Sequence, residues 1–354
     1  NKLFKDKDND LIPPISTILA VLNITPDELK EVPLAHYTSP SVCNKLFNIQ
    51  SNESAGEDTS PLMRIGSSTY MNDPSEGKGL LELLNIPEWE LENKTDCSPY
   101  NAFFTCFSSR VNDLNQFRLY GKEDGVEASG CCLVFNKKGN WLKEPDIFSS
   151  FLGISEKEEL SLGGEYYLPI ENEKLPLYQV AYIAYKDEYI ADENLDIWLT
   201  GQNNTKFGIR LKSVGTNKNW QNFRIQELEK ALHKLIKYFE NKTTIKDDEK
   251  TALECIRYLF KDFAFRDEEE FRLLKIVKMD SEEIEYCETT NSIYLPYADI
   301  RNMVDEVILG TNYEKTNRKR KIEVFQHLMT KECPNVSVSR SSLPIYANPP
   351  IEKN

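Results

Sequence analysis

The chain has 354 residues, with 57 acidic residues against 43 Lys and Arg, and a formal net charge of −14 at pH 7. This acidic balance argues against a protein whose main task is to bind the phosphate backbone of nucleic acids. Because 40% of the residues are apolar and 11% are aromatic, the chain can bury a core, which excludes global disorder. The longest apolar run, Ile15–Ile24, is half of the roughly 20 residues that a membrane span needs, so no transmembrane helix is predicted.

The first predicted elements follow a charged tail, residues 1–14. Ile15–Ile24 favours a short helix, and Thr25-Pro26 begins a second one with acids in its first turn. Residues 1–31 are therefore predicted as a tail with short helices. The next segment, Leu34–Thr38, is apolar around a single His and predicts a buried strand, after which Ser39-Pro40 opens a helix.

The central part of the chain alternates between predicted strands and helices. Met63–Tyr70 is predicted as a strand and Ser75–Leu84 as a helix. Asn101–Ser108 and Gly130–Phe135 are aromatic and β-branched enough for two core strands, with a helix near Asn112–Tyr120 between them.

The second half begins with a strand pattern at Leu177–Tyr185, followed by a stretch at 200–220 that is rich in Gly, Asn, Lys and Thr, and by two amphipathic helices before residue 264. Glu268–Met279 returns to a strand pattern.

Two late strands, Glu306–Leu309 and Val336–Ser341, are predicted to bracket a basic helix that includes Arg318–Lys321. The mixture of strands and helices, without an internal repeat, favours an α+β fold.

Most familiar cofactor and catalytic motifs are absent from the sequence. There is no G-x-G-x-x-G after a strand, no P-loop, no H-E-x-x-H and no G-x-S-x-G. Three His residues cannot build a His-rich metal site, and we expect no metal. The eight Cys show no C-x-x-C pair and are interpreted as mostly reduced thiols; a nucleophile at Cys106 or Cys131-Cys132 is possible, but inert core thiols are the better interpretation.

Three segments place polar groups where a core strand or its end should be apolar. The first is the predicted strand around His36; a lone His in a strand is usually a hydrogen-bonded core residue. The second is residues 66–77 (GSSTYMNDPSEG), where a turn and a helix start would explain Asn72, Asp73 and Glu76 without a ligand.

The third segment, Phe265–Arg272, has the sequence FRDEEEFR. If it enters a strand, Glu268, Glu270 and Arg272 share one face, because strand side chains alternate with period two. Two carboxylates on one face raise each other's pKa, and Arg272 offsets part of that cost. The alternative is a solvated acidic helix end with Arg272 as an ion-pair partner.

Together these segments resemble a bacterial family, domain-of-unknown-function family 2971. Its pattern is an HYT strand, an NDPxE turn, a CFS strand and a late ExE[YF]R segment, which correspond here to His36-Tyr37-Thr38, Asn72–Glu76, Cys106–Ser108 and Glu268–Arg272. The resemblance covers roughly residues 32–346, which implies one catalytic domain with a helical insertion at about 200–264, and leaves 347–354 as a C-terminal tail.

The order of the His strand, the Ser/Tyr segment and the late Glu strand is similar to the ADP-ribosyltransferase arrangement. The resemblance implies a split mixed or antiparallel β-sheet core with surrounding helices, NAD as co-substrate and glycosyltransferase chemistry. It makes Glu270 the catalytic residue and Glu268 the residue that positions the acceptor. The residues implied in binding NAD are His36, Tyr37, Thr38, Ser68, Tyr70, Asn72, Asp73 and Arg272.

The function expected from this resemblance is mono-ADP-ribosylation of a macromolecule, with a protein as the expected acceptor. Such a transferase would act in the bacterial cytoplasm, or in a host cell if it is a secreted effector or toxin. Two alternatives stay open: an NAD glycohydrolase with the same site, and a non-catalytic domain of the same fold that binds a ligand or a protein. Neither the acceptor nor the oligomeric state follows from the sequence.

Overall fold

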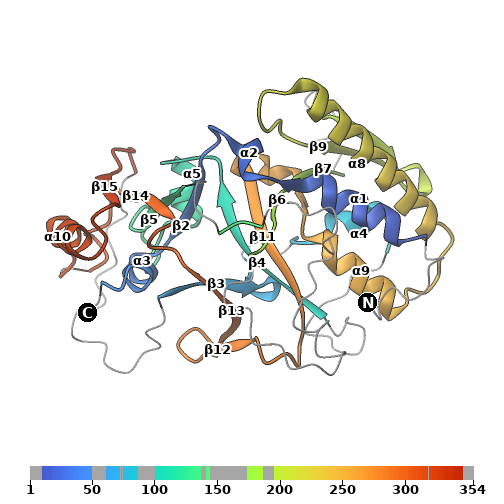
Figure 1. Ribbon diagram of the computed structural model, residues 1–354. Helices are drawn as coiled ribbons and strands as arrows, with labels where there is room; N and C mark the ends of the chain where they lie inside the picture. The colour runs from blue at the N-terminus through green and yellow to red at the C-terminus, as the bar shows by residue number, and fades with distance from the viewer. Residues whose placement is uncertain are drawn as a thin grey trace. The chain divides into compact units, whose positions relative to one another are not determined.

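A computed structural model describes residues 10–49, 61–71, 73, 75–86, 100–136, 141–143, 174–185, 195–317 and 319–345. Helices and mixed or antiparallel strands make up these residues, which confirms the α+β class (Figure 1). The described α-helices are α1 (Ile12–Leu22), α2 (Pro26–Leu29), α3 (Pro40–Leu46), α4 (Gly79–Leu83), α5 (Leu114–Leu119), α8 (Lys218–Phe239), α9 (Asp247–Arg257) and α10 (Ile322–Glu332).

The chain divides into two compact units. The first unit is 1–29, 65–105 and 142–295, and the second is 30–64, 106–141 and 296–354. The strands are β1 (Asn23–Ile24), β2 (Leu34–Thr38), β3 (Leu62–Ser67), β4 (Tyr100–Ser108), β5 (Cys131–Phe135), β6 (Leu177–Gln179), β7 (Ala181–Ala184), β8 (Ile197–Thr200), β9 (Lys206–Arg210), β10 (Phe260–Asp262), β11 (Glu270–Lys278), β12 (Glu285–Cys287), β13 (Ser292–Asp299), β14 (Val304–Leu309) and β15 (Ser337–Arg340).

The first unit is built around β11. This strand pairs antiparallel with β6, lies beside β4, and is buried along all but its last residue. A second small sheet has the order β10-β7-β9-β8, in which β10 and β7 run parallel. Helices α8 and α9 pack against α1, and Figure 1 shows both of them beside α1. These elements hold both ends of the Lys261–Arg272 segment in the core.

The second unit contains the strand of His36. Strand β2 pairs antiparallel with β5 from Leu34 to Thr38, β5 pairs with β14, and β14 runs parallel to β15. The rings of Phe107, Phe135 and Trp141 contact one another in edge-to-face and tilted arrangements, with centroids 5.2–5.6 Å apart. The Phe107 ring also contacts the His36 ring, with centroids 5.8 Å apart, so the aromatic cluster packs against the strand that carries the predicted HYT sequence.

The structure confirms several predicted helix starts, each of which is determined by a capping residue. Thr25 and Glu28 exchange hydrogen bonds with each other's backbone N–H groups and so begin α2. Ser39 accepts from the Val42 N–H ahead of Pro40, and Asp113 caps α5 by accepting from Asn115 and Gln116.

Other predictions are corrected by the structure. Helix α1 starts at Ile12, so Pro13 and Pro14 belong to its first turn, where proline costs no hydrogen bond. The stretch at 200–220, for which no element was predicted, contains β9. Helix α10 begins after Lys321, so the basic run precedes the helix and is not part of it. The predicted strand Met63–Tyr70 ends at Ser67, where a single 3-10 turn follows.

Candidate functional site

The side chains of Glu268 and Glu270 meet because the residue between them has left-handed backbone geometry. Glu268 ends a 3-10 turn (Phe263–Glu268), Glu269 has φ of 47°, and β11 begins at Glu270. The sequence predicted that strand periodicity would put both carboxylates on one face. The two carboxylates do lie together, but a turn residue places them, since Glu268 is not in the strand.

Lys261 joins the two carboxylates. Its Nζ lies 2.6 Å from Glu268 Oε2 and 2.9 Å from Glu270 Oε2, and all three residues are buried. The ammonium group also lies 4.9 Å from the centre of the Phe265 ring. Lys261 comes from β10, which pairs with β7, so the second sheet supplies the cation for two carboxylates, one from the 3-10 turn and one from β11.

Arg272 binds the other side of Glu270. Its Nε lies 2.5 Å from Glu270 Oε1 and its Nη2 lies 3.1 Å from Glu270 Oε2, so the guanidinium forks onto the carboxylate. Its Nη1 donates to Glu76 Oε1 at 2.7 Å and to the Tyr258 carbonyl. The guanidinium also stacks 4.4 Å from the Phe104 ring, and Arg272 is 0% exposed. Such a group must be paired to be buried.

These five residues, Glu76, Lys261, Glu268, Glu270 and Arg272, form what we call the buried charge cluster. It holds three carboxylates against two cations, which leaves one negative charge in excess when all five groups are ionised. Burial alone lowers the pKa of Lys261, but the charge of Glu270, with Glu76 and Glu268, raises that pKa well above its ordinary value. Lys261 therefore stays protonated throughout the physiological pH range.

Tyr182 supports the cluster from β7. Its hydroxyl oxygen accepts the Glu270 backbone N–H at 2.9 Å. Burial, and then the charge of Glu270, raise the pKa of this hydroxyl, so it stays neutral. Glu270 is thus held through its backbone as well as through both carboxylate oxygens.

The predicted Ser/Tyr segment lies in the same unit as the cluster. Ser68 donates to Asn101 Oδ1 at 3.1 Å, and Asn101 donates to Ser67 Oγ at 2.9 Å, so this part of the segment is fixed by a buried polar chain. Tyr70 differs, because its side chain is 51% exposed. Asp73 Oδ1 accepts from the backbone N–H and the hydroxyl of Ser75, as an Asx turn requires, while Asn72 lies outside the described residues.

The HYT residues lie in the second unit. His36 Nδ1 lies 2.9 Å from the Cys106 carbonyl, so the neutral ring carries its proton on Nδ1. Desolvation lowers the pKa of His36, although this hydrogen bond opposes the shift in part. Tyr37 donates to the Arg110 carbonyl and accepts from Asp113 N–H, and Thr38 is paired with Cys131 in the sheet. Tyr37 and Thr38 therefore already have structural partners.

Two functional features escaped the sequence analysis. Lys261 had no assigned role, although a Lys between Phe260 and Phe263 in an apolar segment is a usable signal for a buried, paired cation. The bridge between Glu76 and Arg272 has no sequence signal, because 196 residues separate the two.

The thiols fit the interpretation made from sequence. None of the seven described cysteines is in a disulfide, and Cys97 lies outside the described residues. Burial raises the pKa of Cys132 to about 11 and that of Cys131 well above its ordinary value. A thiol in such surroundings is a poor nucleophile at neutral pH.

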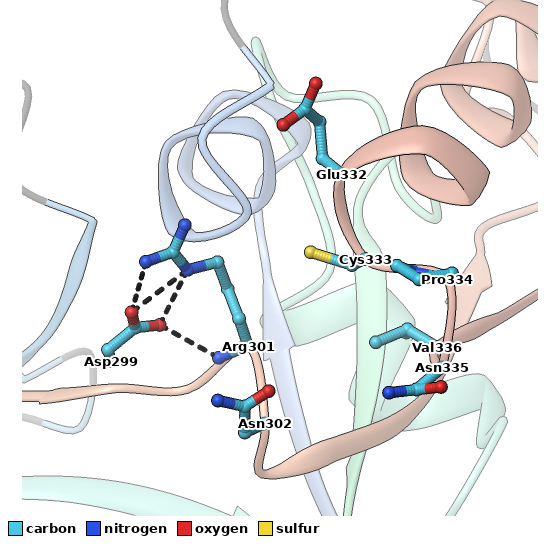
Figure 2. Close-up of a pocket in the computed structure, with 8 residues that line it drawn as sticks. All are labelled: Asp299, Arg301, Asn302, Glu332, Cys333, Pro334, Asn335 and Val336. Carbon is cyan, nitrogen blue, oxygen red and sulfur yellow. Dashed lines mark hydrogen bonds and ion pairs between the residues drawn. The ribbon is translucent and has the colours of Figure 1, made fainter.

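A small pocket of about 220 Å³ lies in the second unit. Figure 2 shows Arg301 forked onto Asp299, with Nε 2.9 and 3.0 Å from the two carboxylate oxygens, and the Cys333 thiol facing the gap. The lining residues are Asp299, Arg301, Asn302, Glu332, Cys333, Pro334, Asn335 and Val336. No residue of the predicted site lines this pocket.

The described part of the chain has neither a metal-binding cluster nor a membrane-spanning helix. No described group of three or more His, Cys, Asp or Glu residues is arranged to hold a metal ion. Among the described helices, none is long and apolar enough to cross a membrane. Comparison with known proteins was equally without result: no family model, no curated protein and no solved structure matches the chain.

Proposed function

We propose that this protein is a mono-ADP-ribosyltransferase that cleaves NAD and transfers ADP-ribose to a protein. The observation that carries the proposal is the buried charge cluster: Glu270 is fixed by Arg272 and Lys261, and Arg272 joins it to Glu76. Two of the three sequence segments that resemble the ADP-ribosyltransferase arrangement, residues 66–77 and 265–272, thus belong to one connected set of charges.

The chemistry explains why such a cluster would serve. When the bond between the ribose anomeric carbon and the nicotinamide nitrogen breaks, the electron pair leaves with nicotinamide and the sugar gains oxocarbenium character. A carboxylate held rigidly near that carbon stabilises the developing positive charge without reorganising. The excess negative charge of the cluster acts in the same direction.

The other residues take roles that follow from their surroundings. Glu270 would hold the ribose hydroxyl, and Glu268 would orient the acceptor, whose nucleophile forms the new bond to the anomeric carbon. The exposed ring of Tyr70 is available to stack on nicotinamide. The NAD-binding role expected for His36 from the resemblance stays a prediction, because His36 belongs to the second unit.

NAD is anionic, so an acidic chain must offset the repulsion with local donors. In the cluster the cations Lys261 and Arg272 already hold carboxylates, and Arg272 is wholly buried. The two cations of the cluster are therefore already engaged by carboxylates, and donors outside the cluster would have to bind the phosphates of NAD. Arg272, assigned to NAD binding from the sequence, is better suited to holding Glu270.

Labelled NAD separates the transferase from the NAD glycohydrolase, because water would replace the protein acceptor after the same first step. The protein is incubated with NAD labelled in its adenylate part, with and without a bacterial or a eukaryotic cell extract. A transferase releases nicotinamide and moves label onto protein, whereas a glycohydrolase releases nicotinamide and free ADP-ribose only. Absence of nicotinamide release under all three conditions would rule out both enzymes.

One observation favours the second candidate, a domain that binds without catalysis. Both carboxylates of the pair are bonded by cations, and Glu268 and Glu270 are only 7% and 4% exposed. A cluster so completely paired could serve the fold alone. Calorimetric binding of NAD by a protein that releases no nicotinamide would support this candidate.

A further inference from the structure

We infer that Glu76 and Arg272 are positioning residues for Glu270: Glu76 fixes the Arg272 guanidinium, and Arg272 fixes both carboxylate oxygens of Glu270. This inference rests on the proposed function and deepens it, because it names the residues that hold the Glu270 carboxylate in place, one of which, Glu76, lies 194 residues before Glu270 in the chain. The support comes from the turn after the Ser/Tyr segment.

Arg272 can hold the Glu270 carboxylate in one place because each nitrogen of its guanidinium donates a hydrogen bond. Nε and Nη2 hold Glu270, while Nη1 holds Glu76 and the Tyr258 carbonyl. The planar guanidinium has no freedom to rotate without breaking one of these contacts. The Phe104 ring, 4.4 Å away, closes one face of the guanidinium.

Glu76 is itself held by the turn that carries it. Before it, Asp73 Oδ1 binds Ser75 through the backbone N–H at 2.8 Å and the hydroxyl at 2.6 Å. After it, Gly77 has φ of +75°, and a Cβ at this position would lie 2.8 Å from the Tyr258 ring. The chain therefore passes close to Tyr258 at the point where it delivers Glu76 to Arg272.

Neutralising Glu76 would have two effects on Glu270. Arg272 would lose one of its two carboxylate partners, which loosens the fork on Glu270. The cluster would also fall from one excess negative charge to none, which weakens its stabilisation of a cationic transition state. Both effects act on the bond-breaking step, so kcat should fall while KM for NAD stays nearly constant.

The test measures steady-state nicotinamide release by the full chain for the wild type, Glu76→Gln, Glu76→Asp and Arg272→Lys. The matched control is Glu82→Gln, the same charge change at an exposed site six residues further on. We expect Glu76→Gln and Arg272→Lys to lose about 10- to 100-fold in kcat with KM changed less than about threefold, since misplacement of a reacting group costs this much. Glu76→Asp, which keeps the charge, should recover part of the loss, and Glu82→Gln should match the wild type.

The outcomes separate the inference from the function on which it rests. A wild-type protein that releases no nicotinamide overturns both. An active wild type whose kcat is unchanged in a folded Glu76→Gln variant overturns only the positioning role. If Glu76→Gln melts below the assay temperature, Glu76→Asp decides: a kcat equal to that of the wild type contradicts the inference, and a kcat reduced at constant KM supports it.

Discussion

Arg272 and Glu76 lie 2.7 Å apart between Nη1 and Oε1, and this ion pair joins two parts of the chain separated by 196 residues. Neither side chain reaches solvent to a useful extent. A buried ion pair alone is weak support for stability, because desolvation offsets much of the attraction. Here the pair is one part of a larger set in which Glu270 and Lys261 also take part, so removing either cation, Lys261 or Arg272, leaves buried carboxylates without compensation.

Lys261 gives the clearest stability prediction. Lys261→Met leaves Glu268 and Glu270 buried with Arg272 as their nearest cation, and we expect a loss of about 3–5 kcal/mol in the free energy of unfolding, measured by urea denaturation. Lys230→Met removes an exposed cation paired with Glu227 and should change that free energy by less than about 1 kcal/mol.

The stability that Lys261 contributes also depends on pH in a predictable direction. The pKa of Lys261 is raised in the folded state, so the stability it contributes is fully present below its unfolded pKa of 10.5 and is lost as pH rises through the higher folded value. The stability difference between the wild type and Lys261→Met should accordingly be constant from pH 7 to pH 9. A cost below about 1 kcal/mol at pH 7 would show that the cluster is not coupled as described.

Gly77 and Gly125 offer a matched pair of substitutions. Both have left-handed φ, 75° and 76°, so Ala at either position should cost about 1–2 kcal/mol in backbone strain. Only at Gly77 would the new Cβ meet a side chain, the Tyr258 ring at 2.8 Å, whereas nothing lies within 4 Å at Gly125. We expect Gly77→Ala to cost about 1–3 kcal/mol more than Gly125→Ala, measured by thermal unfolding. Equal losses would mean that the turn does not approach Tyr258.

His36 provides a prediction about pH in the second unit. Burial lowers its pKa below the ordinary 6.5, so the unfolded chain binds more protons than the folded chain below that pH. The stability contributed by neutral His36 is thus present above pH 6.5 and is lost as pH falls through the folded pKa. His36→Asn, whose amide can donate to the same carbonyl, should flatten this part of the stability profile.

Nuclear magnetic resonance titration of the imidazole measures the His36 pKa directly. It should also show the proton on Nδ1, the atom 2.9 Å from the Cys106 carbonyl. A His36 pKa at or above 6.5, or a proton on Nε2 in the neutral ring, would contradict the environment described for β2.

Local chemistry explains why much of the fold was predictable. The helix beginning at Pro26 and the one beginning at Pro40 are decided by capping residues within a few positions, and β2 by the apolar residues on both sides of His36. The prediction failed where the backbone departs from regular geometry. Glu269 adopts left-handed φ just before β11, and no sequence pattern distinguishes this from a strand that continues through Glu268.

The candidate site was predictable only in its local parts. The pairing of Glu268 with Glu270 followed from their spacing, and Arg272 from its place two residues further on. Lys261 and Glu76 enter through tertiary contacts, which a single sequence does not encode in any local pattern. The resemblance to the ADP-ribosyltransferase arrangement stays a prediction, and chemistry at Glu270 is its decisive point.

Nicotinamide release from NAD by the wild type and by Glu270→Gln tests the central claim most directly. Glu269→Gln is the matched control, because this neighbouring carboxylate pairs with Lys212 outside the cluster. We predict that the wild type and Glu269→Gln release nicotinamide at similar rates and that Glu270→Gln loses about 100- to 1,000-fold in kcat, the usual cost of removing one preorganised electrostatic group. A folded Glu270→Gln variant that cleaves NAD at the wild-type rate would contradict the claim.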